Sequence, residues 1–169
     1  MIYSVGIIVA SDKGSKGERV DQSGDLIRDM MTEAGYDVKE KVVVPDEIDQ
    51  LSEVMVRMSD KDSYHLILTT GGTGFSMRDV TPEATLSVIQ RETPGIPEAM
   101  RAYSMTVTNK AMLSRARAGI RNHTLIINMP GSPKAVKESL TVLLDALGHG
   151  LDILNANASE CGSSDHKQS

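Results

Sequence analysis

Three glycines within four residues form the most distinctive stretch of the chain. Residues 64–83 read YHLILTTGGTGFSMRDVTPE, and the glycines are Gly71, Gly72 and Gly74. Glycine allows a turn with positive φ and lets a ligand approach without a Cβ in the way. Consecutive backbone N–H groups in such a turn can bind an anion. Because an apolar run precedes the glycines and a helix start follows them, the stretch predicts a phosphate-holding loop between strand and helix.

Polar residues extend the chemistry of this loop. Thr73 offers a hydroxyl donor, and Asp79 lies just before the helix, where a carboxylate can reach a metal ion. The helix start is expected to use Thr81 as N-cap, Pro82 at the first position and Glu83 near the positive end of the dipole. The loop lacks the Lys-Ser/Thr pair of a Walker A motif and does not match G-x-G-x-x-G. A turn that needs glycine only for its geometry is the alternative.

Two aspartates are placed alike, each just after a predicted strand. Asp46 follows the strand at 37–44, and Asp79 follows the strand at 64–70. Either one alone could be only a helix cap. Together, beside a phosphate-holding loop, they suggest Mg-nucleotide chemistry, because Mg²⁺ is usually held by one or two carboxylates plus substrate phosphates.

Other chemistries find little support in the sequence. The single Cys161 excludes an intrachain disulfide framework and a Cys-cluster zinc site. Ser76 is not in the Gly-x-Ser-x-Gly elbow of a serine hydrolase. No pair of histidines has metal-ligand spacing; they are His65, His123, His149 and His166.

Composition limits the class of protein. A length of 169 residues predicts one domain, which we place at 1–154 with a polar tail at 155–169. The net charge of −5 gives no basic footprint for nucleic acid, and the 3% of aromatic residues offers few stacking platforms. No apolar run is long enough to span a membrane and no signal peptide is visible, so we expect a cytoplasmic protein.

Strand and helix patterns alternate along the chain. Strands are predicted at 1–10, 37–44, 64–70 and 124–129, with a weak signal at 119–121 before a turn at Asn122-His123. Helices are predicted at about 21–34, from an Asp46 cap through Met58, at 81–91, 98–106 and around 111–115, and from Ser132-Pro133 to 154. A glycine-rich loop is expected at 13–18. This order predicts an α/β fold with a mostly parallel sheet covered by helices on both faces.

Four loops follow strands in this scheme, and they should meet on one edge of the sheet. They are residues 11–24, 45–46, 71–79 and 130–134. Ligands of open parallel sheets bind beyond the carboxyl ends of the strands. The sequence therefore predicts one site that collects all four loops.

The motifs in these loops resemble the Mog/MoaB family of molybdenum cofactor biosynthesis proteins, which includes the G domain of gephyrin. The resemblance covers nearly the whole chain to about residue 154. It is carried by SD at 11–12, PDE at 45–47, LTTGGTG at 68–74, RDVTPEAT at 78–85, LSR at 113–115 with AG at 118–119, and NMPGSP at 128–133.

The resemblance implies a three-layer α/β/α sandwich with the molybdopterin-binding fold, assembled as a homotrimer or homohexamer. It implies molybdopterin adenylyltransferase activity: AMP passes from ATP to molybdopterin with Mg²⁺, giving adenylyl-molybdopterin and pyrophosphate. The implied partners are these small molecules, with other molybdenum cofactor biosynthesis enzymes as further candidates, and neither nucleic acid nor membrane.

The resemblance also assigns residues. Asp46 and Asp79 correspond to the catalytic acidic pair and are the candidate metal ligands. Ser114 and Arg115 fall where the family contacts the pterin. The phosphates of nucleotide and pterin are assigned to Ser11, Asp12, Thr70, Gly71, Gly72, Thr73, Gly74, Pro130, Gly131 and Ser132.

The chemistry agrees with this assignment. The nucleophile would be a terminal phosphate oxygen of molybdopterin, which is already ionised near neutral pH, so no strong general base is needed. Catalysis would rest on holding two anions in line and neutralising charge, with Arg78 or Arg115 as candidate cations. Three alternatives stay open: a catalytically quiet pterin-binding paralogue, a scaffolding module, and a nucleotide hydrolase.

Overall fold

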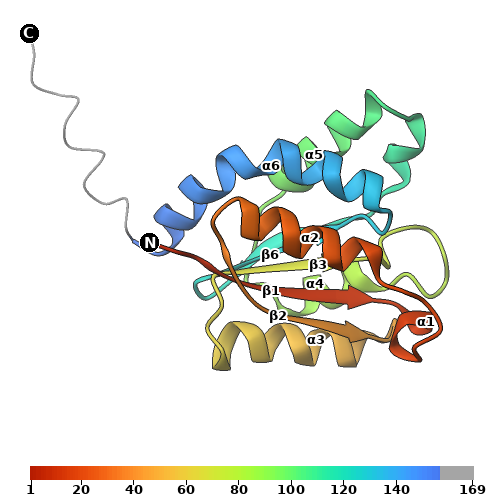
Figure 1. Cartoon of the computed structure of the whole chain (residues 1–169), viewed down its shortest axis with the longest axis horizontal. Helices are drawn as coiled ribbons and strands as arrows, with labels where there is room; N and C mark the ends of the chain where they lie inside the picture. Colours follow the sequence, from red (N-terminus) through yellow and green to blue (C-terminus); the bar gives the residue numbers. More distant parts are fainter. Residues whose placement is uncertain (157–169) are drawn as a thin grey trace, which may run out of the picture.

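The computed structural model describes residues 1–156, and its sheet has six strands (Figure 1). The strands are β1 (Ser4–Ala10), β2 (Asp37–Val44), β3 (Leu66–Thr70), β4 (Arg91–Glu92), β5 (Ala118–Arg121) and β6 (Thr124–Met129). The helices are α1 (Asp12–Ser15), α2 (Gln22–Glu33), α3 (Ile48–Val56), α4 (Thr81–Val88), α5 (Gly95–Met105) and α6 (Pro133–Leu154), with a π-helical turn η1 (Arg57–Lys61) and a 3-10 helix η2 (Asn109–Leu113).

The strand order is β2-β1-β3-β6-β5-β4, and the first four strands run parallel. β5 is antiparallel to both of its neighbours. Its antiparallel pairing with β6 follows from a tight turn at Asn122, with φ of +52°, that joins the two strands directly. Asparagine tolerates this left-handed conformation. The predicted α/β fold with a mostly parallel sheet is confirmed, and so is the turn.

Apolar runs explain why the parallel strands lie in the middle of the molecule. All residues of β3 and β6 are buried, as expected for strands covered on both faces. Successive side chains point to opposite faces, so Leu66 and Leu68 belong to one core while Ile67 belongs to the other.

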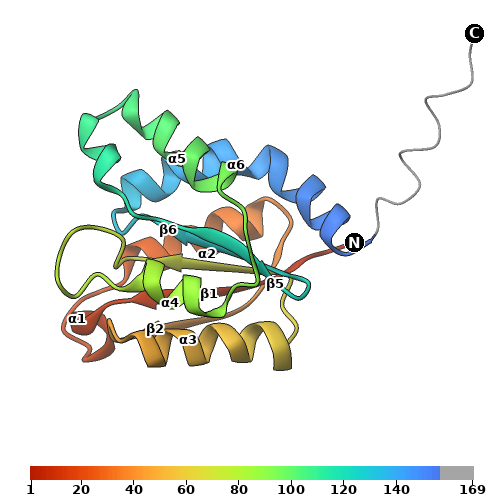
Figure 2. The ribbon, with the colours of Figure 1, turned by 180° about the vertical axis from the view of Figure 1, so that it is seen from behind.

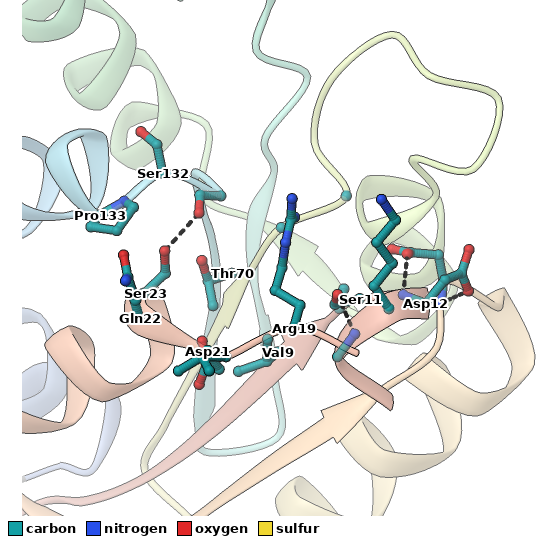
Figure 3. A pocket seen from close by; sticks show the side chains of 18 of the residues that line it. Val9, Ser11, Asp12, Arg19, Asp21, Gln22, Ser23, Thr70, Ser132 and Pro133 are labelled. Carbon is teal, nitrogen blue, oxygen red and sulfur yellow. Dashed lines mark hydrogen bonds between the residues drawn. The ribbon is translucent and has the colours of Figure 1, made fainter. Parts of the chain in front are cut away.

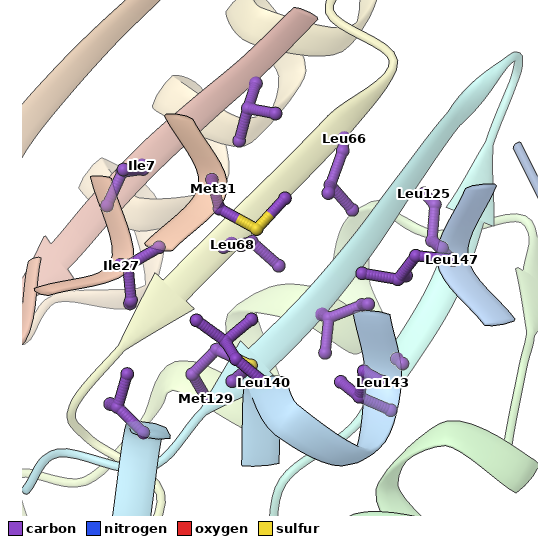
Figure 4. Close-up of a cluster of buried hydrophobic side chains, with 14 of the residues drawn as sticks. Ile7, Ile27, Met31, Leu66, Leu68, Leu125, Met129, Leu140, Leu143 and Leu147 are labelled. Carbon is purple, nitrogen blue, oxygen red and sulfur yellow. The ribbon is translucent and has the colours of Figure 1, made fainter. Parts of the chain in front are cut away.

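The two cores give the molecule three layers. One face of the sheet is covered by α2, α5 and α6, whose buried side chains include Ile27, Met31 and Leu140 (Figure 4). The other face is covered by α3 and α4, through Leu51, Met55 and their neighbours; the view from behind shows α4 beside α3 (Figure 2).

The ends of several helices match the sequence patterns. Ser132 caps α6 by accepting a hydrogen bond from the Ala135 N–H group at 3.2 Å, and Pro133 occupies the first turn. Asp21 caps α2 through the Gly24 N–H group at 2.8 Å, and Gly35, with φ of +90°, follows its end. Local sequence determined these boundaries because each cap lies within three residues of its partner.

Two expected caps are wrong. Asp46 does not cap α3: the N-cap position belongs to Glu47, which makes no side-chain capping bond. Thr81 does not cap α4: Val80 holds the N-cap position, and the Thr81 hydroxyl donates to the Gly71 carbonyl at 2.9 Å. In both cases a tertiary partner took the side chain that local propensity would have used for capping.

Two further expectations need correction. The helix predicted at 81–91 ends at Val88, because Arg91 and Glu92 pair with β5 as strand β4. The loop expected at 13–18 begins with the short helix α1, which Ser11 caps. Of the polar tail at 155–169, only residues 155 and 156 are described, so Cys161 and His166 lie outside the described residues. No helix among residues 1–156 is both long and apolar enough to cross a bilayer.

Candidate active site

One cavity of about 830 Å³ opens at the carboxyl ends of the parallel strands (Figure 3). It collects residues from all four loops named from the sequence, as the topology predicts. Its lining is Val9, Ala10, Ser11, Asp12, Lys13, Gly14, Arg19, Val20, Asp21, Gln22, Ser23, Asp46, Thr70, Gly71, Gly72, Asp79, Gly131, Ser132 and Pro133.

The glycine corner needs glycine for two reasons. Gly71 and Gly72 have φ of +92° and +68°, in the left-handed region that other residues avoid. A Cβ on Gly71 would lie 2.5 Å from the Ala10 carbonyl oxygen, and one on Gly72 would overlap the Thr81 hydroxyl. The Cβ on Gly72 would also lie 3.2 Å from Asp46 Oδ1. The bare backbone therefore lets the ends of β1, β2 and β3 approach one another at the cavity.

Asp12 and Asp46 hold each other across the cavity floor. The Asp12 N–H group donates to Asp46 Oδ2 at 2.9 Å, and the Asp46 N–H group donates to Asp12 Oδ1 at 3.0 Å. This exchange ties the loop after β1 to the loop after β2. It explains why Asp46 is not available to cap α3.

The two carboxylates of this exchange have opposite environments. Arg78 donates to Asp12 at 3.0 and 3.1 Å and to Glu47 at 2.7 Å. The Arg78 hydrogen bonds hold the pKa of Asp12 below its usual range. Burial raises the pKa of Asp46, and the negative charges of Asp12 and Asp79 add to that effect. Asp46 thus forms no ion pair of its own within residues 1–156, and the Arg78 charge offsets its burial only in part.

Asp79 completes the acidic side of the cavity. Its Oδ2 accepts the Ser76 N–H group at 3.1 Å. Within residues 1–156, no lysine or arginine forms an ion pair with Asp46 or Asp79.

These two carboxylates fit a Mg²⁺ ion in donor type and number. Mg²⁺ keeps several waters and uses one or two carboxylates together with substrate phosphates. The part of the chain that the structure describes contains no ready-made cluster of three or more metal-ligating side chains. A site of this kind would bind the metal ion together with the substrate phosphates, and not by protein side chains alone.

The opposite side of the cavity is polar, and its one acidic side chain, that of Asp21, is neutralised by Lys41 at 2.7 Å. The Ser23 hydroxyl donates to the Gly131 carbonyl at 2.6 Å, and the Thr70 hydroxyl donates to the Pro130 carbonyl at 2.7 Å. Figure 3 shows Ser23, Thr70 and Ser132 on this side and Asp12 on the other, with the Arg19 side chain between them.

The cavity lining contains one arginine, Arg19, and one lysine, Lys13. Neither forms an ion pair within residues 1–156. Two other nearby cations are already engaged: Arg78 binds Asp12 and Glu47, and Lys41 binds Asp21 and Asp25. The free positive charge of the cavity therefore comes from the loop between β1 and α2.

The structure brings most of the predicted site residues together. The cavity is lined by Ser11, Asp12, Asp46, Thr70, Gly71, Gly72, Asp79, Gly131 and Ser132. Five others do not line it: Thr73, Gly74, Pro130, Ser114 and Arg115.

The residues outside the lining have contacts of their own. Pro130 supplies the carbonyl that Thr70 binds, and the Ser114 hydroxyl accepts the Ala116 N–H group at 3.3 Å. Arg115 donates to the carbonyls of Gly74 and Asp79. Arg78 and Arg115, the two candidate cations, are thus both committed to partners within the protein.

Sequence reasoning missed several lining residues. Lys13, Arg19, Gln22 and Ser23 all lie in the loop that follows β1 or at the start of α2. The sequence predicts this loop as part of the site but assigns a role only to its first two residues, Ser11 and Asp12. No local signal pairs Ser23 with Gly131, because the two are 108 residues apart.

Comparison with known proteins agrees with this geometry. Residues 6–149 match the family model described as a probable molybdopterin binding domain. The chain is 41% identical to the molybdopterin adenylyltransferase of Helicobacter pylori J99, over 90% of this chain and 88% of that protein. It is 43% identical to gephyrin of Dictyostelium discoideum, over 91% of this chain but 23% of gephyrin.

Comparison with a solved structure points to the same family. The crystal structure of the molybdopterin biosynthesis enzyme MoaB from Thermus thermophilus superposes with a TM-score of 0.87 at 42% identity, covering 92% of this chain and 98% of that one. The fold, the cavity and a match over most of the sequence converge on one family. This chain belongs to the molybdopterin-binding domain family of molybdenum cofactor biosynthesis proteins.

Proposed function

We propose that this protein is a molybdopterin adenylyltransferase that transfers AMP from ATP to molybdopterin. One observation carries the proposal: a glycine corner and two carboxylates that form no ion pair within residues 1–156, Asp46 and Asp79, share one cavity. Relatives that match about 90% of this chain at about 40% identity carry the same activity in their names.

The reaction requires little from the protein in the way of proton transfer. A terminal phosphate oxygen of molybdopterin attacks the α-phosphorus of ATP, a P–O bond forms, and the P–O bond to pyrophosphate breaks. The attacking oxygen is already ionised near neutral pH. The main requirements are to hold two polyanions in line and to offset their charge.

The residues of the cavity meet these requirements in different ways. Gly71 and Gly72 line the cavity, and their backbone would meet a phosphate bound there. Asp46 and Asp79 would hold Mg²⁺, which when bound supplies positive charge at the α-phosphate. Arg19 and Lys13 supply further positive charge in a protein whose net charge is −5. The neutral side with Ser23, Thr70 and Ser132 leaves room for a second, uncharged part of a substrate.

The proposal includes a homo-oligomer, either a trimer or a hexamer. The segment from α5 to η2 exposes apolar side chains that a monomer would leave in water. They are Tyr103, Met105, Val107, Met112 and Leu113.

The test is turnover by the purified protein with ATP, Mg²⁺ and molybdopterin. We expect pyrophosphate and adenylyl-molybdopterin in equal amounts, and no pyrophosphate when the pterin is omitted. Consumption of ATP without pterin would instead indicate a nucleotide hydrolase. Tight pterin binding without any turnover would indicate a catalytically quiet binding protein, and either result would overturn the proposal.

A further inference from the structure

The loop that carries Asp79 is held at both ends by one arginine. Residues 74–79 leave the glycine corner as an open excursion and return at the start of α4 (Figure 2). Arg115 Nε donates to the Gly74 carbonyl at 2.8 Å, and Arg115 Nη2 donates to the Asp79 carbonyl at 2.7 Å. The backbone N–H group of Arg115 also donates to the Thr73 carbonyl at 2.8 Å. The guanidinium therefore closes the neck of the loop.

Apolar packing contributes little to holding this loop. Phe75 is 71% exposed and Met77 is 94% exposed, so the large side chains of the excursion are not buried. Within the loop, the Asp79 N–H group donates to the Ser76 carbonyl at 2.9 Å, and Asp79 Oδ2 accepts the Ser76 N–H group. The position of the Asp79 carboxylate thus depends on polar contacts. The Arg115 contacts and the hydrogen bond from the Thr81 N–H group to the Gly72 carbonyl, at 3.1 Å, join the two ends of the loop, and only the Arg115 contacts reach both Gly74 and Asp79.

Arg115 is itself fixed on its far side. It forms an ion pair with Glu83 in the first turn of α4, and its Nη2 lies 3.4 Å from Glu83 Oε2. Its backbone belongs to the segment between η2 and β5, which is separate in sequence from both the loop and α4. Three segments therefore meet at one planar group, whose fork of donors suits two acceptors at once.

We propose that Arg115 is a positioning residue that holds the Asp79 carboxylate at the cavity by bridging the carbonyls of Gly74 and Asp79. This inference rests on the proposed function, in which Asp79 acts on the metal and the α-phosphate. It gives Arg115 a role other than pterin contact. The guanidinium makes four hydrogen bonds inside the protein and does not line the cavity.

Replacing Arg115 by lysine tests the bridging hydrogen bonds separately from the positive charge. Arg115→Lys keeps the positive charge but offers a single ammonium, which cannot span the two carbonyls in the same plane. We expect kcat to fall about 10- to 100-fold, as for a small displacement of a reacting group. The Mg²⁺ concentration for half-maximal rate should rise, while the KM and the dissociation constant for molybdopterin stay within about twofold, since Arg115 does not line the cavity.

Hydrogen exchange provides a readout that is independent of activity. In Arg115→Lys, the amides of Ser76 and Asp79 should exchange faster than in the parent protein, because the neck of the loop is open more often. The matched control is Arg117→Lys, two residues along the same segment, where the arginine is exposed and its side chain pairs with Glu92. That variant should leave the exchange, the Mg²⁺ requirement and kcat unchanged.

A second variant keeps the test decisive if Arg115→Lys folds poorly. Glu83→Gln removes the ion pair that orients the guanidinium but leaves both carbonyl contacts possible, so it should change the same quantities in the same direction by a smaller factor. Weaker pterin binding in Arg115→Lys, in proportion to the loss of kcat, would overturn the proposal and indicate a ligand contact. Unchanged exchange and unchanged kcat in both variants would also overturn it.

The failure of this inference and of the proposed function can be told apart. If the parent protein gives no turnover, the proposed function fails and Arg115 has no reaction to serve. Faster exchange in Arg115→Lys would still establish in that case that Arg115 closes the loop. If the parent turns over and Arg115→Lys matches it in every measurement, only the positioning role is lost.

Discussion

Two clusters of charged residues lie in different parts of the molecule and differ in how completely they are satisfied. At the corner between η1 and the β5–β6 turn, Arg121 donates to both oxygens of Asp60 at 2.9 and 2.6 Å, and Asn122 donates to Asp60 at 2.9 Å. At the cavity, Asp46 and Asp79 have no cation partner among residues 1–156.

The pKa values follow this difference. The Arg121 hydrogen bonds hold the pKa of Asp60 below its usual range, whereas burial and neighbouring negative charges raise that of Asp46. A carboxylate whose oxygens are bound within the protein, as in Asp60, is not available to a ligand and contributes to the stability of the fold. A carboxylate that is buried without a counter-charge is unfavourable for the fold and available for a cation. The contrast distinguishes a structural acid, Asp60, from a candidate functional acid, Asp46.

The largest expected effect concerns activity. Asp79→Asn should lower kcat about 10²- to 10³-fold, because the neutral side chain loses its attraction for Mg²⁺, while pterin binding changes little. Steady-state turnover and pterin binding by titration would measure the two quantities. Asp60→Asn is the matched control and should leave kcat unchanged. Equal losses of kcat and pterin affinity in Asp79→Asn would contradict the metal role.

The next effect concerns stability at the glycine corner. Gly72→Ala combines a positive φ with a Cβ that overlaps Thr81, and should lower the free energy of unfolding by about 2–4 kcal/mol. Gly17→Ala shares the positive φ, +73°, but its Cβ meets nothing within 4 Å, so it should cost about 1 kcal/mol. Urea unfolding of both variants would measure the difference. Equal costs would mean that the corner is not tightly packed.

The smallest effect is the pH dependence of stability. The lowered pKa of Asp60 means that its contribution is present above the unfolded pKa, near 3.9, and is lost as the pH falls through the folded value. Asp60→Asn should therefore lower Tm near pH 7 by about 1–3 °C, and the difference should close in acid.

Asp46→Asn should behave in the opposite way. The raised pKa of Asp46 means that its ionised form is unfavourable in the folded protein, so removal of the charge should raise Tm near pH 7. The gain should disappear as the pH falls through the folded pKa, where the parent becomes neutral as well. Thermal melts of both variants from pH 3 to pH 8 would measure the two curves. If both variants had a lower Tm than the parent protein at pH 7, the proposed difference between Asp60 and Asp46 would be contradicted.

The parallel strands, the helices on both faces of the sheet and the edge at which the site lies could be predicted from the sequence, whereas the two-residue strand β4 could not. Continuous apolar runs such as LILTT and TLIINM can only be buried on both faces, which makes a parallel sheet with helices on each side. The carboxyl ends of parallel strands share one edge, so Asp46, Asp79 and the glycine corner had to come together. Helix caps whose partner lies within one turn, such as Ser132 for α6, could also be predicted from the sequence.

Which partner each polar side chain binds depends instead on the folded arrangement of the chain. Asp46 binds the Asp12 N–H group instead of capping α3, the Thr81 hydroxyl binds the Gly71 carbonyl instead of capping α4, and Arg115 closes the Asp79 loop. Partners of this kind are 10 to 36 residues apart. A hydrogen bond has a range of about 3 Å, so these choices depend on which backbones the fold brings together, and one sequence carries no local record of that.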